Sequence, residues 1–265
     1  MVVLSRVVTS HSNATVKAVK ALHMRKTREE TGQFLAEGLK IVTEAIELGF
    51  TPKILMFGQD GGDHPLLVKA IGATGMAGGD VIEVNREILE KVARRDNPQS
   101  VLAVFDQVFT PAEALVPDSA KVWVALHKVR DPGNLGTIIR TADAAGCGGV
   151  ILVGDCCDPY SVEAVRATMG SIFAVPIVKL TEAEFIARRA GWPGSVVGTL
   201  LTATVDHRSA DYQRPTLILM GNEQAGLTPE LAALCDVNVK IPMRGRADSL
   251  NLSVATGIMI YAAGD

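Results

Sequence analysis

The sequence predicts an α/β protein of two domains. Short apolar runs alternate with segments of helical spacing along the whole chain. In the second half these runs are nearly all apolar and rich in β-branched residues, as in residues 122–126 and 216–220, which is typical of a parallel sheet covered on both faces. The 265 residues exceed the usual size of one domain. We therefore expect domains at 1–108 and 121–265, joined by a linker at 109–120 that contains Pro111 and Pro117.

The composition is that of an ordinary folded protein. Hydrophobic residues make up 48%, charged residues 21%, and the net charge is −3, so nucleic-acid binding would require a local basic face. The four cysteines have no C-x-x-C spacing, which favours reduced thiols and a cytoplasmic location. The N-terminal residues lack the apolar core of a signal peptide, and no run is long enough to span a membrane. We expect neither a membrane segment nor a metal site.

The N-terminal domain combines a basic start with an alternating α/β pattern. Its expected elements after that start are helix 39–49, strand 53–57, helix 65–73, strand 81–85, helix 86–95 and strand 100–108. Two basic stretches, near residues 17–28 and at 94–95, could hold phosphate groups, although short basic runs are also common on solvated helix faces. The candidate nucleic-acid-binding residues are Lys17, Arg25, Lys26, Arg28, Arg94 and Arg95.

The C-terminal domain is expected to contain six strands. They lie at residues 122–126, 150–153, 176–180, 195–201, 216–220 and 237–241. Helical segments separate most of them, as parallel strands require.

The first polar motif, residues 131–146, follows strand 122–126. Asn134 can cap a helix there, and Arg140 falls off the apolar stripe of that helix. Helical side chains lean toward the N-terminus, so Arg140 can lie back over Gly136 and recognise a phosphate or carboxylate. The alternative is a surface pair of Arg140 with Asp143.

The second motif is Gly-x-Glu-x-x-Gly, formed by Gly221, Glu223 and Gly226 directly after strand 216–220. Ligands of open α/β sheets bind at the carboxyl ends of strands, and glycines allow a close backbone approach. An ordinary turn with Glu223 at a helix N-terminus is the alternative.

The third motif, residues 241–255, turns at Pro242 and Gly245 and continues as a helix that Asp248 or Ser249 can cap. Capping does not account for Asn251 one turn later. Gly257 within the helix costs roughly 1 kcal/mol relative to alanine, which indicates close helix packing, for example between subunits.

The order N-x-G-x-x-x-R, G-x-E-x-x-G and I-P-M…S-L-N-x-S resembles the three motifs of the SpoU (TrmH-like) family of RNA ribose 2′-O-methyltransferases, in the SPOUT superfamily. The resemblance implies a homodimer whose C-terminal domain has a parallel sheet with a trefoil knot and binds S-adenosylmethionine. The N-terminal part is similar to the small α/β substrate-binding domain of the family, which resembles certain ribosomal proteins. Structured RNA, most of all rRNA, is the implied substrate.

The resemblance also implies the residues of the site. The cofactor would be held by Thr199, Leu200, Met220, Gly221, Ile241, Met243, Leu250 and Asn251. The polar active site would contain Asn134, Arg140, Glu223, Ser249 and Asn251, with Arg140 acting within its own chain or across the dimer. Two alternatives stay open, a tRNA 2′-O-methyltransferase and a non-catalytic RNA-binding protein. A dinucleotide-dependent oxidoreductase is disfavoured because no G-x-G-x-x-G follows a first strand.

Overall fold

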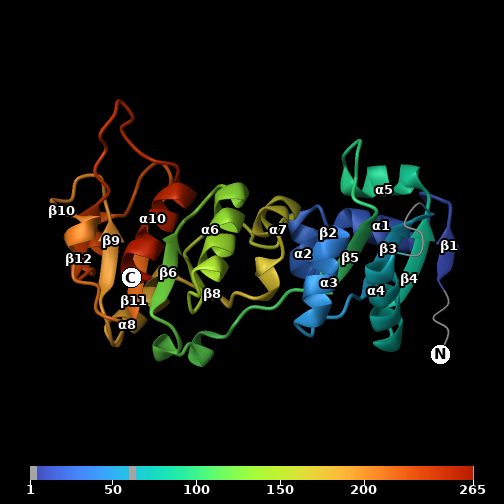
Figure 1. The fold of residues 1–265 in the computed structure, drawn as a ribbon, viewed down its shortest axis with the longest axis horizontal. Helices are drawn as coiled ribbons and strands as arrows, with labels where there is room; N and C mark the ends of the chain where they lie inside the picture. The colour runs from blue at the N-terminus through green and yellow to red at the C-terminus, as the bar shows by residue number, and fades with distance from the viewer. Residues whose placement is uncertain (1–4, 60–63, 265) are drawn as a thin grey trace. The chain divides into compact units, whose positions relative to one another are not determined.

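The computed structural model describes residues 5–59 and 64–264. The chain divides into two compact units (Figure 1). The first contains Met1–Gln107 and Tyr160–Phe173, and the second contains Val108–Pro159 and Ala174–Asp265. The fold class is α/β in both units, as the sequence predicts.

Residues 160–173 belong to the first unit, which the contiguous boundary at residue 121 did not anticipate. The reason is aromatic packing. The Tyr160 and Phe173 rings lie 4.6 and 5.7 Å from the Phe34 ring, and Val162 joins the apolar core of the first unit. Aromatic and aliphatic burial of this kind outweighs proximity in sequence.

The first unit is built on a five-stranded mixed sheet of order β1-β4-β3-β5-β2. Its elements are β1 Arg6–Val8, α1 Ala14–Ala21, α2 Arg25–Thr31, β2 Gln33–Glu37, α3 Leu39–Glu47, β3 Ile54–Gly58, α4 Pro65–Met76, β4 Asp80–Val84, α5 Arg86–Ala93, β5 Val101–Asp106, α7 Val162–Thr168 and η4 Ser171–Phe173. Strands β1 and β2 were not predicted. Helices α1 and α5 share a core with one face of the sheet. Helices α3 and α4 pack against each other, and they also contact strands β2 to β5.

The second unit is built on a seven-stranded parallel sheet of order β10-β12-β9-β11-β6-β7-β8. Its elements are η2 Ala112–Ala114, η3 Pro117–Ser119, β6 Val122–His127, α6 Pro132–Ala144, β7 Val150–Val153, β8 Ile177–Leu180, α8 Glu182–Arg189, β9 Val196–Thr199, β10 Val205–Asp206, η5 His207–Ser209, β11 Thr216–Met220, α9 Pro229–Ala233, β12 Val237–Lys240 and α10 Leu252–Gly264. The six predicted strands are all present, and the short β10 is an addition.

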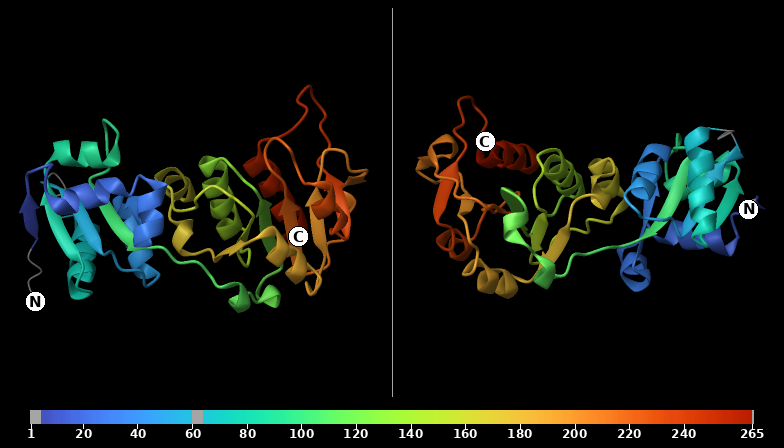
Figure 2. Two further views of the ribbon diagram at one scale, coloured as in Figure 1. Left: turned by 180° about the vertical axis from the view of Figure 1, so that it is seen from behind. Right: turned by 60° about the horizontal axis from the view of Figure 1, so that its bottom comes forward.

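Two helix layers cover this sheet. Helices α6 and α10 pack against each other on one face (Figure 2), and the other face carries α8 and α9 around a core that includes Phe185 and Leu231. A side chain at Gly257 would meet Thr141 Cγ2 at 3.6 Å, an ordinary van der Waals distance, so α10 packs against α6 of the same chain at this glycine. Because the strands are parallel, the carboxyl ends of β6, β9, β11 and β12 lie at the same edge of the sheet, and the three motifs follow there. The knot implied by the resemblance stays a prediction.

No helix in the described ranges has the length and apolar character needed to cross a membrane.

Candidate active site

A pocket of about 400 Å³ lies at the carboxyl ends of β9 and β11. Its lining includes the predicted cofactor residues Thr199, Leu200, Met220, Gly221, Ile241, Met243 and Leu250, together with Ser249. Asn251 is not among the lining residues. The pocket is within the size range of small-molecule sites, and its wall combines apolar side chains with backbone groups at the strand ends.

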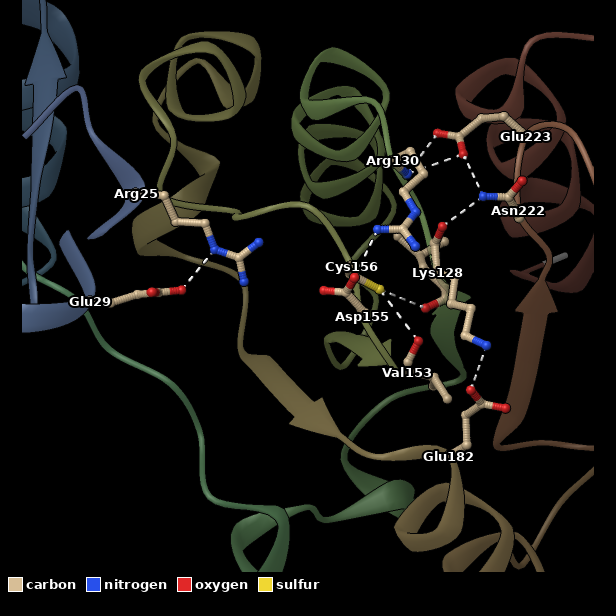
Figure 3. A network of polar contacts seen from close by, with 11 residues as sticks. Arg25, Glu29, Lys128, Arg130, Val153, Asp155, Cys156, Glu182, Asn222 and Glu223 are labelled. Carbon is tan, nitrogen blue, oxygen red and sulfur yellow. Dashed lines mark hydrogen bonds and ion pairs between the residues drawn. The ribbon is translucent and has the colours of Figure 1, made fainter. Parts of the chain in front are cut away.

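Glu223 holds the backbone at the start of α6 (Figure 3). Its carboxylate accepts hydrogen bonds from Arg130 N at 3.1 Å and from Asp131 N at 3.1 Å, and from Asn134 Nδ2 at 3.4 Å. A negative group is favourable beside a helix N-terminus. The start of this helix therefore holds the chain's own Glu223 carboxylate, while the first motif was predicted to recognise a phosphate or a carboxylate.

The cap of α6 is Asp131 rather than Asn134. The Asp131 carboxylate accepts the Asn134 N–H at 2.6 Å, and α6 begins at Pro132. Asn134 lies within the first turn, where its side chain is free to bond elsewhere. A proline at the first helical position and an aspartate before it are both favoured there.

Asn134 joins the first motif to the third. Asn251 Nδ2 donates to Asn134 Oδ1 at 2.8 Å, while Asn251 Oδ1 accepts from Ser253 N at 2.9 Å and Ser253 Oγ at 2.6 Å. Asn251 is thus the capping side chain of α10, in place of Asp248 or Ser249. Its amide serves the helix and the site at once, because one end accepts and the other donates.

Arg140 lies apart from this network. Its side chain is exposed on α6, and within the described residues no hydrogen bond or ion pair connects it to Glu223 or Asn134. The structure therefore brings Asn134, Glu223 and Asn251 together, places Ser249 on the pocket wall, and leaves the guanidinium of Arg140 in solvent.

Asn222 and Lys128 were missed by sequence reasoning. Asn222 Nδ2 donates to the Lys128 carbonyl at 2.8 Å, and Lys128 has a φ of 51°, an uncommon backbone conformation for a residue other than glycine (Figure 3). Side chains of the same loop are also paired: Lys128 Nζ with Glu182 at 2.7 Å and Arg130 with Asp155 at 2.9 Å. The position of Asn222 next to Glu223 was the only available signal.

The cysteines show no sign of a nucleophilic role. Burial raises the pKa of Cys147, Cys157 and Cys235 to about 12, so these thiols stay protonated at neutral pH. Among the residues that the structure describes, no group of three or more metal-ligating side chains is found.

The predicted RNA-binding residues of the first unit differ in their surroundings. Arg28 is buried, with 4% exposure, and its Nη1 donates to the Leu22 carbonyl at 2.7 Å, so it supports the fold and cannot contact RNA. Arg25 and Lys26 are exposed and paired with Glu29 and Glu30 one turn later. Arg95 is paired with the buried Glu37.

Lys17 and Arg94 are exposed cations without an acidic partner in the described part of the chain. Lys20, one turn after Lys17 on α1, has the same character and was not predicted. Helix α1 packs beside α5, whose C-terminal cap is Arg94. We use the name α1–α5 basic face for Lys17, Lys20 and Arg94, the exposed cations on these two packed helices and the cap of α5.

Comparisons with known proteins agree with this architecture. The chain is 31% identical over 253 residues to the 23S rRNA (guanosine(2553)-2′-O)-methyltransferase RlmP of Bacillus subtilis, covering 95% of this chain and 96% of that protein. It is 32% identical over 246 residues to the 23S rRNA (uridine(2479)-2′-O)-methyltransferase of Streptomyces viridochromogenes, covering 90% and 85%. An AdoMet-bound rRNA methyltransferase from Sinorhizobium meliloti has a similar structure, with a TM-score of 0.91, 48% identity and coverage of 98% and 97%.

Two family models cover most of the sequence. Residues 13–103 match the MRM3-like substrate binding domain. Residues 121–261, which contain all three motifs, match the model of the SpoU rRNA Methylase family. With the pocket at the strand ends and the three motifs joined around Glu223 and Asn134, this match shows that the chain belongs to the SpoU rRNA Methylase family.

Proposed function

We propose that this protein is an S-adenosylmethionine-dependent methyltransferase that methylates a ribose 2′-OH of ribosomal RNA. The observation that carries the proposal is the 400 Å³ pocket bordered by Glu223 and Ser249, within a network that joins all three family motifs. The relatives named above support rRNA rather than tRNA as the substrate, since both carry 23S rRNA in their names.

The pocket suits S-adenosylmethionine. Leu200, Met220, Ile241, Met243 and Leu250 provide apolar surface for the adenosine, and the strand ends provide backbone donors and acceptors. Thr199 Oγ1 on this wall is buried and has no hydrogen-bond partner among the described residues, which is costly unless a ligand supplies one. When bound, the cofactor supplies an electrophilic methyl group.

The residues of the chain position the nucleophile. Glu223 accepts hydrogen bonds from the loop at Arg130 and Asp131, and the Asn134–Asn251 hydrogen bond ties that loop to α10, so these contacts hold the loop in place beside the pocket. Fixed geometry can remove a large part of the barrier of a two-substrate reaction. Ser249 lies on the pocket wall, and its hydroxyl would hydrogen-bond the ribose of the RNA.

Arg140 completes this arrangement as a phosphate contact. A guanidinium cannot accept the 2′-OH proton, because its pKa exceeds about 12. Its role is to hold the phosphate next to the reacting ribose and to stabilise negative charge on the 2′-oxygen, while the proton passes to phosphate or water. Exposure on α6 leaves it available for this contact.

We also propose a homodimer formed through the second unit. Helix α10 exposes Val254 and Tyr261 by 51% and 53%, and Leu250 just before it by 36%. Large apolar side chains at this spacing make an exposed stripe on one helix face, which a second copy can cover. Arg140 would then reach the site of its partner.

The test is methyl transfer to rRNA. Purified protein, radiolabelled S-adenosylmethionine and rRNA isolated from a strain that lacks the gene should give incorporation at one ribose, located by alkaline-resistant cleavage mapping. Rescue of the lost 2′-O-methyl group by the intact gene, but not by Arg140→Ala, is expected. An unchanged methylation map in the deletion strain would contradict the proposal.

A further inference from the structure

The loop Asn222 to Gly226 separates two hollows. One is the 400 Å³ pocket, and the other, of about 690 Å³, is lined on its far side by His127, Lys128, Arg130, Asp131 and Asn134. All five residues of the loop border both hollows. A ligand bound in either hollow would therefore contact the same loop, residues 222–226.

The Asn222 side chain stabilises this loop internally. Its Oδ1 accepts from Gln224 N at 2.9 Å and from Ala225 N at 3.2 Å, and the Asn222 and Gly226 backbones pair in both directions. A side chain at Gly221 would meet the Gly226 carbonyl carbon at 2.1 Å, so the loop folds back tightly onto the end of β11. Hydrogen bonds from the backbone to an asparagine side chain two or three residues earlier stabilise a turn of this kind.

The same side chain holds the opposite loop. Asn222 Nδ2 donates to the carbonyl of Lys128, the residue with a φ of 51°, and Glu223 accepts from the backbone N–H groups of Arg130 and Asp131. An uncommon backbone conformation persists only where neighbouring groups hold it. Residues 128–131 thus depend on the loop that forms the wall of the first pocket.

We propose that Asn222 is a positioning residue that couples the cofactor pocket to residues 128–134, so that filling the pocket stiffens the loop on the RNA side. This inference rests on the proposed function, which assigns the two hollows to cofactor and RNA. None of residues 128–134 lines the 400 Å³ pocket, so a ligand there acts on them through neighbouring elements, and the Asn222 loop makes direct hydrogen bonds to Lys128, Arg130 and Asp131. Each site then binds its ligand more tightly when the other is filled.

Hydrogen exchange of the full-length protein tests this coupling, with S-adenosylhomocysteine as the probe. The ligand should slow exchange about tenfold in the peptide 128–134 as well as in 222–226. In Asn222→Ala the effect on 128–134 should vanish, while calorimetry shows an affinity for the probe within about threefold of wild type. Asn222→Asp keeps the acceptor oxygen and loses the donor, so protection should persist in 222–226 and disappear in 128–134.

Activity gives a second readout. Both variants should lower kcat for rRNA at least tenfold with little change in KM for S-adenosylmethionine, and Asp118→Asn, an exposed change in η3, should alter neither. Slower exchange confined to 222–226 in the wild type would overturn the coupling and leave the proposed function standing. The coupling would also be overturned if the ligand slowed exchange in 128–134 of Asn222→Ala as much as in the wild type. If the wild type binds neither the probe nor S-adenosylmethionine, the proposed function itself is rejected, and the inference falls with it.

Discussion

At the scale of single residues, Glu223 has a structural task that its place in a catalytic motif does not reveal. Both carboxylate oxygens are used by backbone and amide donors of residues 130–134. Hydrogen bonds to a charged group contribute about 1.5–3 kcal/mol each, so the loop depends strongly on this side chain.

We expect Glu223→Ala to lower kcat by roughly two orders of magnitude, because two or more charge-assisted hydrogen bonds are lost. Glu223→Gln keeps one acceptor oxygen and should lose less activity. Steady-state methylation of rRNA measures both. Equal activity of the alanine variant and the wild type would show that the loop needs no such support.

The α1–α5 basic face should control RNA affinity. Lys20→Ala and Arg94→Ala each remove a cation that has no acidic partner among the described residues, so the slope of log K against log salt should fall by about 0.7–0.9 if each contacts one phosphate. Lys26→Ala is the matched control, since Lys26 lies near Glu30. Filter binding to large-subunit rRNA at several salt concentrations measures the slopes. A larger effect from Lys26→Ala would place the RNA elsewhere.

At the scale of elements, the start of α10 combines a helix cap with a site contact in Asn251. Aspartate can replace its acceptor oxygen but not its donor. Asn251→Asp should therefore keep the stability of the protein and lose most activity, while Asn251→Ala should also lower the free energy of unfolding by about 1 kcal/mol. Urea unfolding and methyl transfer on the same preparations separate the two. Full activity in Asn251→Asp would show that methyl transfer does not need the hydrogen bond from Asn251 to Asn134.

The sequence predicted the elements better than their ends. Regular apolar runs located all six main strands of the second unit, because burial on both faces leaves a clear pattern. The predicted cap of α6 lay three residues too late, at Asn134 instead of Asp131. The predicted cap of α10 lay two or three residues too early, at Asp248 or Ser249 instead of Asn251. Several polar residues precede each helix, and the choice among them depends on contacts such as that of Asn251 with Asn134, 117 positions away.

The candidate site was predictable where the motif residues line the pocket directly. Thr199, Met220 and Leu250 are examples, and all three lie on the wall. Asn222 was not predictable, since its importance comes from a carbonyl in a different segment. The burial of Arg28 was hidden for a related reason: its stretch of sequence is basic throughout, and only the fold shows which member turns inward.

At the scale of the whole molecule, assembly is open to a direct test. Val254→Glu places a charge in the exposed apolar stripe of α10 and should convert a dimer into a monomer in sedimentation velocity. If Arg140 acts across the dimer, activity should fall in parallel. Adding wild-type chains to the Val254→Glu variant should then not restore the activity that the variant has lost. A wild-type protein that sediments as a monomer would contradict the proposed dimer.

Within the first unit, Glu37 joins the 160–173 segment to the sheet. Its side chain is 2% exposed and contacts Arg95 at 3.3 Å, Arg166 Nε at 2.7 Å and Gln99 N at 3.1 Å. Glu37→Ala leaves two arginines without their shared partner and should lower the free energy of unfolding by roughly 3 kcal/mol. Urea titration measures this. Glu83→Ala on β4 is the control, with an expected change below about 0.5 kcal/mol.

The inclusion of Tyr160–Phe173 in the first unit has a consequence for synthesis of the protein on the ribosome. The N-terminal strands emerge first, yet the aromatic cluster around Phe34 lacks Tyr160 and Phe173 until much later. Domains of most proteins complete their folding in the order of translation. Here the N-terminal unit must wait, with its aromatic surface exposed, until more than half of the chain has left the exit tunnel. A nascent chain arrested soon after Gln107 should therefore be more sensitive to protease than one arrested beyond Phe173.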